Sequence, residues 1–149
     1  MPARQTTVAM PVESEILLEV LTSHEACLSW CPVAVEIDGA HRGRFAAGDR
    51  AEIRGSLGGR SVSFQLEILA ANRDCFALRA LGPFTIEASY RFGPALPEGT
   101  LVRLDVATSS PRGLAGRLGA KVVDALLGAG FMDTTLERIR DYALAAGTS

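Results

Sequence analysis

Five consecutive segments between residues 50 and 108 alternate apolar and polar side chains with a period of two. Because successive side chains of a strand point to opposite faces, this period predicts strands with one apolar face each. Short turn signals such as Gly-Gly and Gly-Pro separate the segments, which predicts hairpin connections. The middle of the chain therefore predicts an antiparallel meander. Its strands are Arg50–Leu57, Arg60–Leu69, Cys75–Leu81, Phe84–Phe92 and Thr100–Thr108.

Helical periodicity occurs only near the two ends of the chain. An amphipathic helix is predicted at Val12–Leu21, and Ser23 is a candidate cap for a second short helix that ends near Leu28. Two further strands, Thr6–Met10 and Val33–Ile37, bring the predicted sheet to about seven strands. Apolar residues in steps of three and four from Gly113 to Ala145 predict one continuous helix about 45–50 Å long. This order of elements indicates an α+β fold, with an antiparallel sheet curved around the long helix.

Composition limits the function classes that fit the chain. Its 149 residues indicate one domain over residues 1–149, and 15 Lys+Arg against 17 Asp+Glu leave no basic stripe for nucleic acid. Although 48% of the residues are hydrophobic, no apolar run is long enough to span a membrane. The first residues lack a signal-peptide pattern, and three cysteines are too few for a disulfide framework. We therefore expect a cytoplasmic protein with free thiols.

The strand period also assigns side chains to the two faces of the sheet. The outward set mixes both signs of charge, and Arg54 belongs to it. The inward set carries almost no ionisable group, which argues against acid–base or metal chemistry on that face. Tyr90 is its main polar side chain, and its hydroxyl could position a ligand, act as a weak acid or bond a buried backbone group.

Several short patterns occur together in the order typical of one superfamily. They are Met10-Pro11-Val12-Glu13, Trp30-Cys31-Pro32-Val33, Gly48-Asp49-Arg50, Leu81-Gly82-Pro83-Phe84 and Pro97-Glu98-Gly99-Thr100-Leu101-Val102. With these patterns the chain resembles the START-like, or SRPBCC, superfamily, close to its polyketide cyclase/dehydrase and lipid-transport branch. The resemblance covers roughly Thr6 to Tyr142 and implies the helix-grip fold.

The resemblance also implies an apolar cavity between the sheet and the C-terminal helix, which binds a small hydrophobic ligand such as a lipid or polyketide. No cofactor and no metal are expected. The residues expected to bind the ligand are Trp30, Ile53, Phe64, Leu66, Phe76, Leu78, Phe84, Ile86, Tyr90, Val102, Leu104, Val122 and Met132.

Two other functions stay open. A polyketide cyclase or dehydratase could act in the same cavity with Tyr90 assisting proton transfer, although the pocket arginine of such enzymes has no inward counterpart here. The segment from Leu114 to Ala120 is similar to the superfamily branch associated with carbon monoxide dehydrogenase, which implies assembly or membrane recruitment. In that case Arg112, Arg117 and Lys121 would contact the membrane or a partner. A homodimer also stays open.

Two local features have alternative interpretations. His24, Cys27, Cys31 and His41 could form a zinc set, but the spacing of the two cysteines does not match a standard zinc knuckle, which favours core thiols and surface histidines. Glycines at 128 and 130 indicate either a hinged lid in the long helix or close backbone packing against the sheet.

Overall fold

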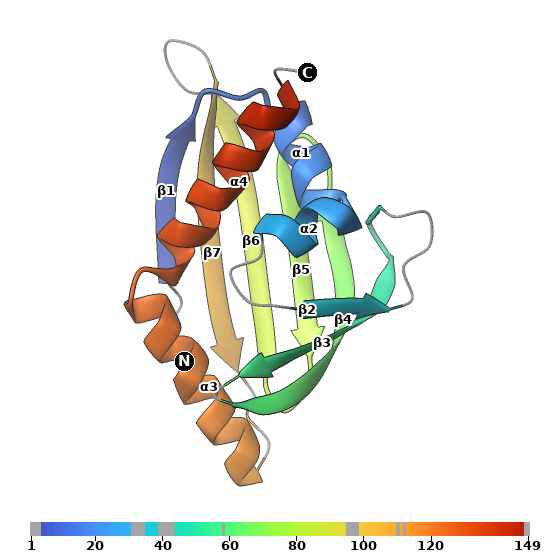
Figure 1. Ribbon diagram of the computed structural model, residues 1–149, viewed down its shortest axis with the longest axis vertical. Helices are drawn as coiled ribbons and strands as arrows, with labels where there is room; N and C mark the ends of the chain where they lie inside the picture. Colours follow the sequence, from blue (N-terminus) through green and yellow to red (C-terminus); the bar gives the residue numbers. More distant parts are fainter. Residues whose placement is uncertain are drawn as a thin grey trace.

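The fold is described from a computed structural model (Figure 1). The structure describes residues 4–30, 35–38, 44–57, 59–94, 99–109, 111 and 113–147, with the side chains of a few of these residues excepted. Within these ranges no helix is both long enough and apolar enough to cross a membrane.

Seven antiparallel strands form one sheet in the order β1-β7-β6-β5-β4-β3-β2. All pairs between β3 and β7 join neighbours along the chain, which confirms the predicted meander, while β1 pairs with β7 from the other end of the sequence. The strands are β1 (Arg4–Met10), β2 (Val35–Asp38), β3 (Arg50–Leu57), β4 (Arg60–Ala71), β5 (Cys75–Leu81), β6 (Thr85–Pro94) and β7 (Thr100–Ser109).

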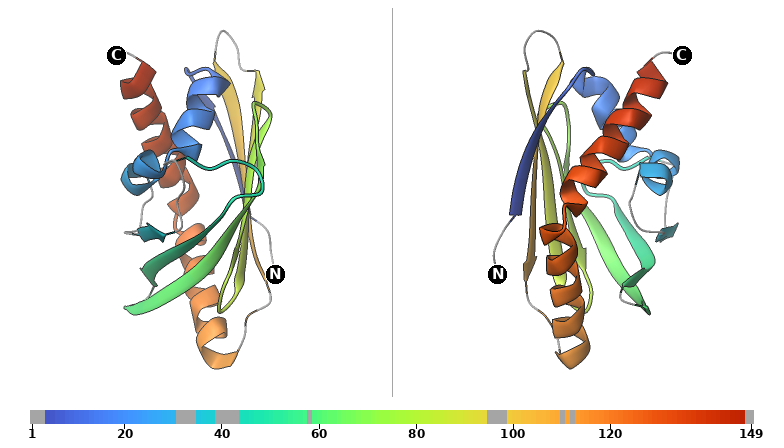
Figure 2. Two further views of the ribbon diagram at one scale, coloured as in Figure 1. Left: turned by 90° about the vertical axis from the view of Figure 1, so that its right-hand side faces the viewer. Right: turned by 60° about the vertical axis from the view of Figure 1, so that its left-hand side comes forward.

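The four helices of the described ranges lie on one side of this sheet, which curls around them (Figure 2). The helices are α1 (Ser14–Thr22), α2 (His24–Trp30), α3 (Gly113–Gly128) and α4 (Phe131–Gly147). The Ser23 hydroxyl accepts a hydrogen bond from the Ala26 N–H at 3.2 Å, so the predicted cap of the second helix is confirmed. The α+β class and the antiparallel sheet against a C-terminal helix are likewise confirmed.

The prediction of one continuous C-terminal helix is wrong in one respect. The helix is divided into α3 and α4 at Ala129 and Gly130, where Gly130 adopts a φ of +89°. A left-handed backbone at this position ends the first helix, and glycine adopts it without the steric cost that other residues meet. The apolar steps continue across the break, which is why periodicity alone does not reveal it.

Buried apolar side chains form two clusters. The larger core lies between the sheet and α1, α2 and α4, and its most buried members include Leu17, Phe76 and Leu136. The smaller core holds Phe64 and Phe84 together with Ala120 and Ala80, so it attaches α3 to the sheet. Phe84 itself precedes β6, in the turn after β5, rather than starting the strand as predicted.

Glycines allow α3 to approach this turn closely. A Cβ added to Gly119 would lie 2.8 Å from the Phe84 ring, and one added to Gly116 would meet the Pro83 carbonyl group. At the other end of α3, the Arg4 guanidinium donates to the Asp124 carboxylate at 3.1 Å. The helix is thus fixed to the sheet at both ends.

Candidate functional site

A cavity of about 290 Å³ lies where the two cores meet, between the sheet and the helices. Its wall is composed almost entirely of apolar side chains from strands β2 to β7, all four helices and the segment before β3. The residues that line it are Leu21, Cys27, Ile37, Phe45, Ile53, Gly55, Ser56, Val62, Phe64, Leu66, Phe76, Leu78, Ala80, Ile86, Ala88, Tyr90, Leu104, Val106, Val123, Leu126, Leu127, Phe131, Met132 and Thr135.

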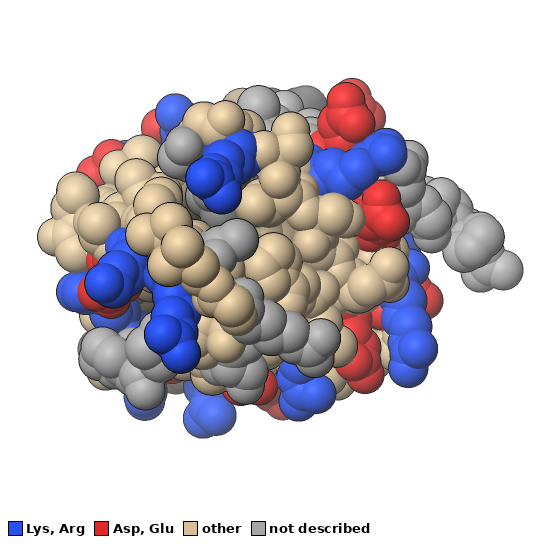
Figure 3. Space-filling model, turned by 90° about the horizontal axis from the view of Figure 1, so that it is seen from below, with Lys and Arg blue, Asp and Glu red and all other residues tan. Residues whose placement is uncertain are grey.

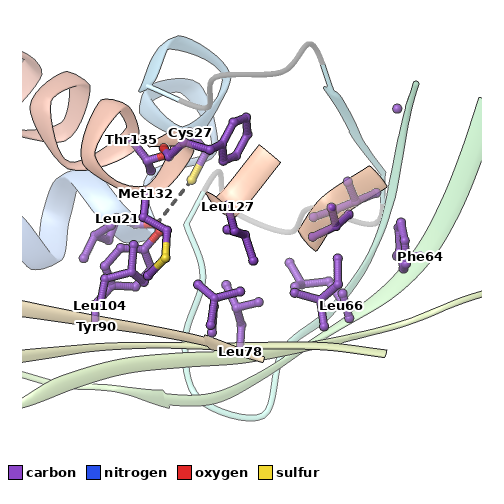
Figure 4. Close-up of a pocket in the computed structure, with 18 of the residues that line it drawn as sticks. Leu21, Cys27, Phe64, Leu66, Leu78, Tyr90, Leu104, Leu127, Met132 and Thr135 are labelled. Carbon is purple, nitrogen blue, oxygen red and sulfur yellow. Dashed lines mark hydrogen bonds between the residues drawn. The ribbon is translucent and has the colours of Figure 1, made fainter. Parts of the chain in front are cut away.

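Side chains from opposite layers point into the same space (Figure 4). Leu66 and Leu78 rise from the sheet, and Leu127 of α3 reaches toward them from the helical layer. The strand period accounts for the lower wall, because every second residue of β4, β5 and β6 faces the helices. The upper wall depends on the helical faces of α3 and α4.

One end of the cavity is closed and the other is open to solvent. At the closed end Tyr90, Leu104 and Met132 gather, and all three are buried (Figure 4). At the other end the wall includes Ser56, which is exposed, and Val62, which is half-buried. We call this second region the open end.

The cavity wall holds few polar groups. The Cys27 thiol donates to the Leu21 carbonyl at 3.2 Å, and the Thr135 hydroxyl donates to the Phe131 carbonyl at 2.8 Å. Tyr90 packs against Phe76 with ring centroids 6.1 Å apart. Among the described residues that line the cavity, none is an Asp, Glu, Lys, Arg or His. Such a wall suits an apolar molecule, because a buried charge needs a partner that this wall does not supply.

The outward position predicted for Arg54 agrees with its contacts. Its guanidinium lies 3.4 Å from the Glu36 carboxylate and 3.6 Å from the Glu52 carboxylate, and its side chain is half exposed. It is not among the residues that line the cavity. The arginine expected of a cyclase pocket is therefore not supplied by this residue.

A buried histidine lies behind the cavity wall. The His24 ring packs on Phe45, a wall residue, with centroids 4.0 Å apart, and neither ring nitrogen has a hydrogen-bond partner among the described residues. Burial lowers the pKa of His24 below 6.5, and the Asp49 carboxylate partly offsets this effect. Burial thus favours the neutral form of the imidazole.

The alternative of a zinc set gains no support from the described residues. Cys27 is used in the hydrogen bond to Leu21, and no three His, Cys, Asp or Glu side chains in the described ranges come together as metal ligands. Cys31 and His41 lie outside those ranges.

Most of the predicted ligand-binding residues line the cavity. Three do not: Phe84 belongs to the smaller core, Val102 is buried in the larger one, and Val122 is half-buried on α3 without lining the cavity. Trp30 ends α2, but its side chain lies outside the described part of the chain. The predicted residues found in the wall are Ile53, Phe64, Leu66, Phe76, Leu78, Ile86, Tyr90, Leu104 and Met132.

The helical side of the wall is largely absent from the prediction. Val123, Leu126 and Leu127 of α3 line the cavity. A signal for these positions was present, because Gly116, Gly119 and Ala120 mark the face of α3 that packs closely, and residues 123 and 127 follow on that face. No comparable signal identifies Phe45, which reaches the cavity from an irregular segment.

Comparisons with known proteins match this architecture at the level of structure. No protein-family model and no curated protein sequence matches the chain. TTHA0849 from Thermus thermophilus has a TM-score of 0.71 at 20% identity, with 97% of this chain and 99% of that chain covered. Ara h 8.0201 has a TM-score of 0.66 at 15% identity, with coverage of 97% and 98%.

DynU16, a protein of the dynemicin biosynthetic locus, has a TM-score of 0.62 at 21% identity. That match covers 97% of this chain but 48% of DynU16, so the chain spans about half the length of that protein. At these identities the comparisons establish the fold. It is the helix-grip fold that the resemblance implied.

Proposed function

We propose that this protein binds a small hydrophobic ligand in the cavity between the sheet and the C-terminal helices. One observation carries the proposal: the cavity has a volume of about 290 Å³ and a wall without a charged side chain among the described residues. Ligand sites in proteins typically measure about 300–1,000 Å³ and are lined mainly by apolar and aromatic groups. The volume lies just below that range, which favours a compact ligand.

The chemistry of the wall narrows the ligand class. The Cys27 and Thr135 donors are engaged by backbone carbonyl groups, so neither is available to a ligand carboxylate without breaking a hydrogen bond. A carboxylate placed at the closed end would also lack a cation. We therefore expect an uncharged ring system or chain inside, with any ionised group kept at the open end.

Fluorescence of N-phenyl-1-naphthylamine tests the proposal, because this uncharged probe brightens when it enters an apolar site. We expect saturable binding and displacement by fatty alcohols or sterols. Ala88→Phe places a ring in the cavity and should abolish binding. Ala77→Phe is the matched control, since Ala77 lies on the opposite face of the neighbouring strand and pairs with Ser89.

Two results would contradict the proposal. It is wrong if the unmodified protein shows no saturable binding of the probe and native mass spectrometry finds no bound lipid, sterol or polyketide. Equal binding by both phenylalanine variants would place the site elsewhere. Circular dichroism of each variant checks that the fold is retained.

Catalysis in the same cavity is a second candidate function. Tyr90 favours it, because it is the one phenol in the wall and lies at the buried closed end. A phenol can donate or accept a proton during cyclisation or dehydration while the cavity orients the chain. Tyr90→Phe should then lower turnover of a polyketide-like substrate by more than about tenfold while leaving probe binding intact. An unchanged rate would remove Tyr90 from the mechanism.

We also propose that the protein acts in the cytoplasm as a single domain. The chain holds three cysteines, too few for a disulfide framework, as expected in a reducing compartment. Fractionation of the expressing cell, followed by immunodetection, would test the location.

A further inference from the structure

The solvent-facing side of α3 is unusually apolar. Leu114 has 74% of its surface exposed and Leu118 has 46%, and the two residues are one helical turn apart. Leucines at i and i+4 lie on the same helix face, so the pair forms one continuous apolar strip. No other leucine of the described chain is as exposed as Leu114.

This strip lies opposite the face that packs on the protein. Gly116 and Gly119 approach the Pro83 carbonyl group and the Phe84 ring, and Ala120 is buried. With 3.6 residues per turn, residues 114 and 118 then point away from the sheet. The leucines are therefore not part of either core, and folding does not require them to be apolar.

The neighbouring helix shows what an ordinary surface looks like in this protein. The exposed side of α4 carries Asp133, Glu137, Arg138 and Asp141, so both signs of charge are present. Alternation of charge of this kind is typical of a solvated helix face. The exposed side of α3 differs, because it carries two leucines, and its exposed charged residues, Arg117 and Lys121, are both basic.

Basic residues flank the leucine strip. Arg117 and Lys121 are exposed, and each lies three positions after one of the two leucines. The one acidic residue of α3, Asp124, is engaged by Arg4 at 3.1 Å. Seen from the end of the molecule where α3 begins, uncharged residues cover much of the face, and both basic and acidic groups lie around its margins (Figure 3).

We propose that this outer face of α3 (Leu114, Arg117, Leu118 and Lys121) docks on an anionic lipid bilayer. A helix with an apolar strip and flanking basic residues lies in the membrane interface, where leucines enter the boundary and cations contact lipid phosphates. Charge complementarity selects anionic lipid over a neutral surface. The inner face of the same helix lines the cavity through Val123 and Leu127.

The role of this docking depends on the proposed function, because the bilayer would be the source or the destination of the hydrophobic ligand. A docked α3 would place the cavity wall directly against the lipid. A ligand could then pass between bilayer and cavity without crossing bulk water, which disfavours apolar surface.

Flotation on sucrose gradients tests the docking. The full chain is mixed with vesicles of phosphatidylcholine alone or phosphatidylcholine with phosphatidylglycerol. We expect flotation with the anionic vesicles only, weakened by added salt. The double variant Arg117→Gln/Lys121→Gln should lower the partition coefficient roughly 25-fold, and Leu114→Ser/Leu118→Ser at least about tenfold.

A matched control removes the same charge elsewhere. Arg50→Gln/Arg91→Gln takes two exposed cations from the strands and should float like the unmodified protein. Probe binding in solution should be unchanged in all these variants, because none of the substituted residues lines the cavity. That readout keeps the docking inference separate from the proposed function.

Three results would overturn the inference. The first is no flotation with anionic vesicles by the unmodified protein, even if the probe still binds. The second is equal loss of flotation in the control and in Arg117→Gln/Lys121→Gln. The third is a dimer in sedimentation that Leu114→Ser/Leu118→Ser dissociates, together with no flotation, which would make this face a contact between two copies of the chain.

Discussion

Gly116→Ala tests how closely α3 packs on the sheet. The added Cβ would fall against the carbonyl oxygen of Pro83 and 3.2 Å from its carbonyl carbon. Both are backbone atoms in the turn before Phe84, which is fully buried, so the turn cannot shift without moving that ring. Either α3 or the turn must be displaced.

Two opposing effects set the magnitude. Forcing a methyl group into a filled site costs about 1–3 kcal/mol, whereas alanine stabilises a helix interior by about 0.5–1 kcal/mol relative to glycine. The free energy of unfolding should therefore fall by up to about 2.5 kcal/mol. For a chain of this length, such a change lowers the melting temperature by up to roughly 10 °C.

Urea denaturation followed by circular dichroism measures this difference, with Gly128→Ala as the matched control. A Cβ on Gly128 would meet only the flexible Arg4 side chain, at 3.4 Å, so the helix-propensity gain should remain and stability should be unchanged or slightly higher. If the two variants are equally stable, the close approach of α3 to the turn does not exist and the reasoning is refuted.

Three further measurements address other parts of the fold. Because burial lowers the pKa of His24, the unfolded chain binds more protons than the folded protein at mildly acidic pH. The free energy of unfolding should therefore fall as the pH drops below 6.5 and become constant below the pKa of the folded state. His24→Phe should remove this dependence of stability on pH. Thr100→Val removes a 2.6 Å hydrogen bond to the buried Val12 carbonyl and should cost about 1–3 kcal/mol in urea. Leu136→Ala empties a fully buried site and should cost about 2–5 kcal/mol by the same assay, and a loss below about 1 kcal/mol would contradict its place in the core.

The sheet could be predicted well from sequence because its signal is local. Alternation in β4, β5 and β6 identifies both the strands and the residues that face the helices, and Leu66 and Leu78 lie in the cavity wall for that reason. The short turns between these strands reverse the direction of the chain, so consecutive strands are expected to pair antiparallel.

The helical wall was harder to predict because its contacts are tertiary. The break at Gly130 depends on one backbone dihedral that the apolar period does not encode. Phe45 reaches the cavity from an irregular segment, and its position depends on packing with His24, which no short-range pattern predicts. Val102 faces inward as its strand period indicates, but neighbours from the larger core fill the space in front of it.

The pairing of β1 with β7 has a consequence for how the chain folds. Arg4 pairs with Val106 and Met10 with Thr100, so β1 has no partner until the last strand has formed. Bringing β1 to β7 closes a loop that contains most of the chain, and the entropy lost in closing it slows this step. Each hairpin from β3 to β7 instead joins strands that are neighbours along the chain. During synthesis the strands of the meander can pair while β1 stays unpaired. The sheet is complete only after β7 has left the ribosome and paired with β1.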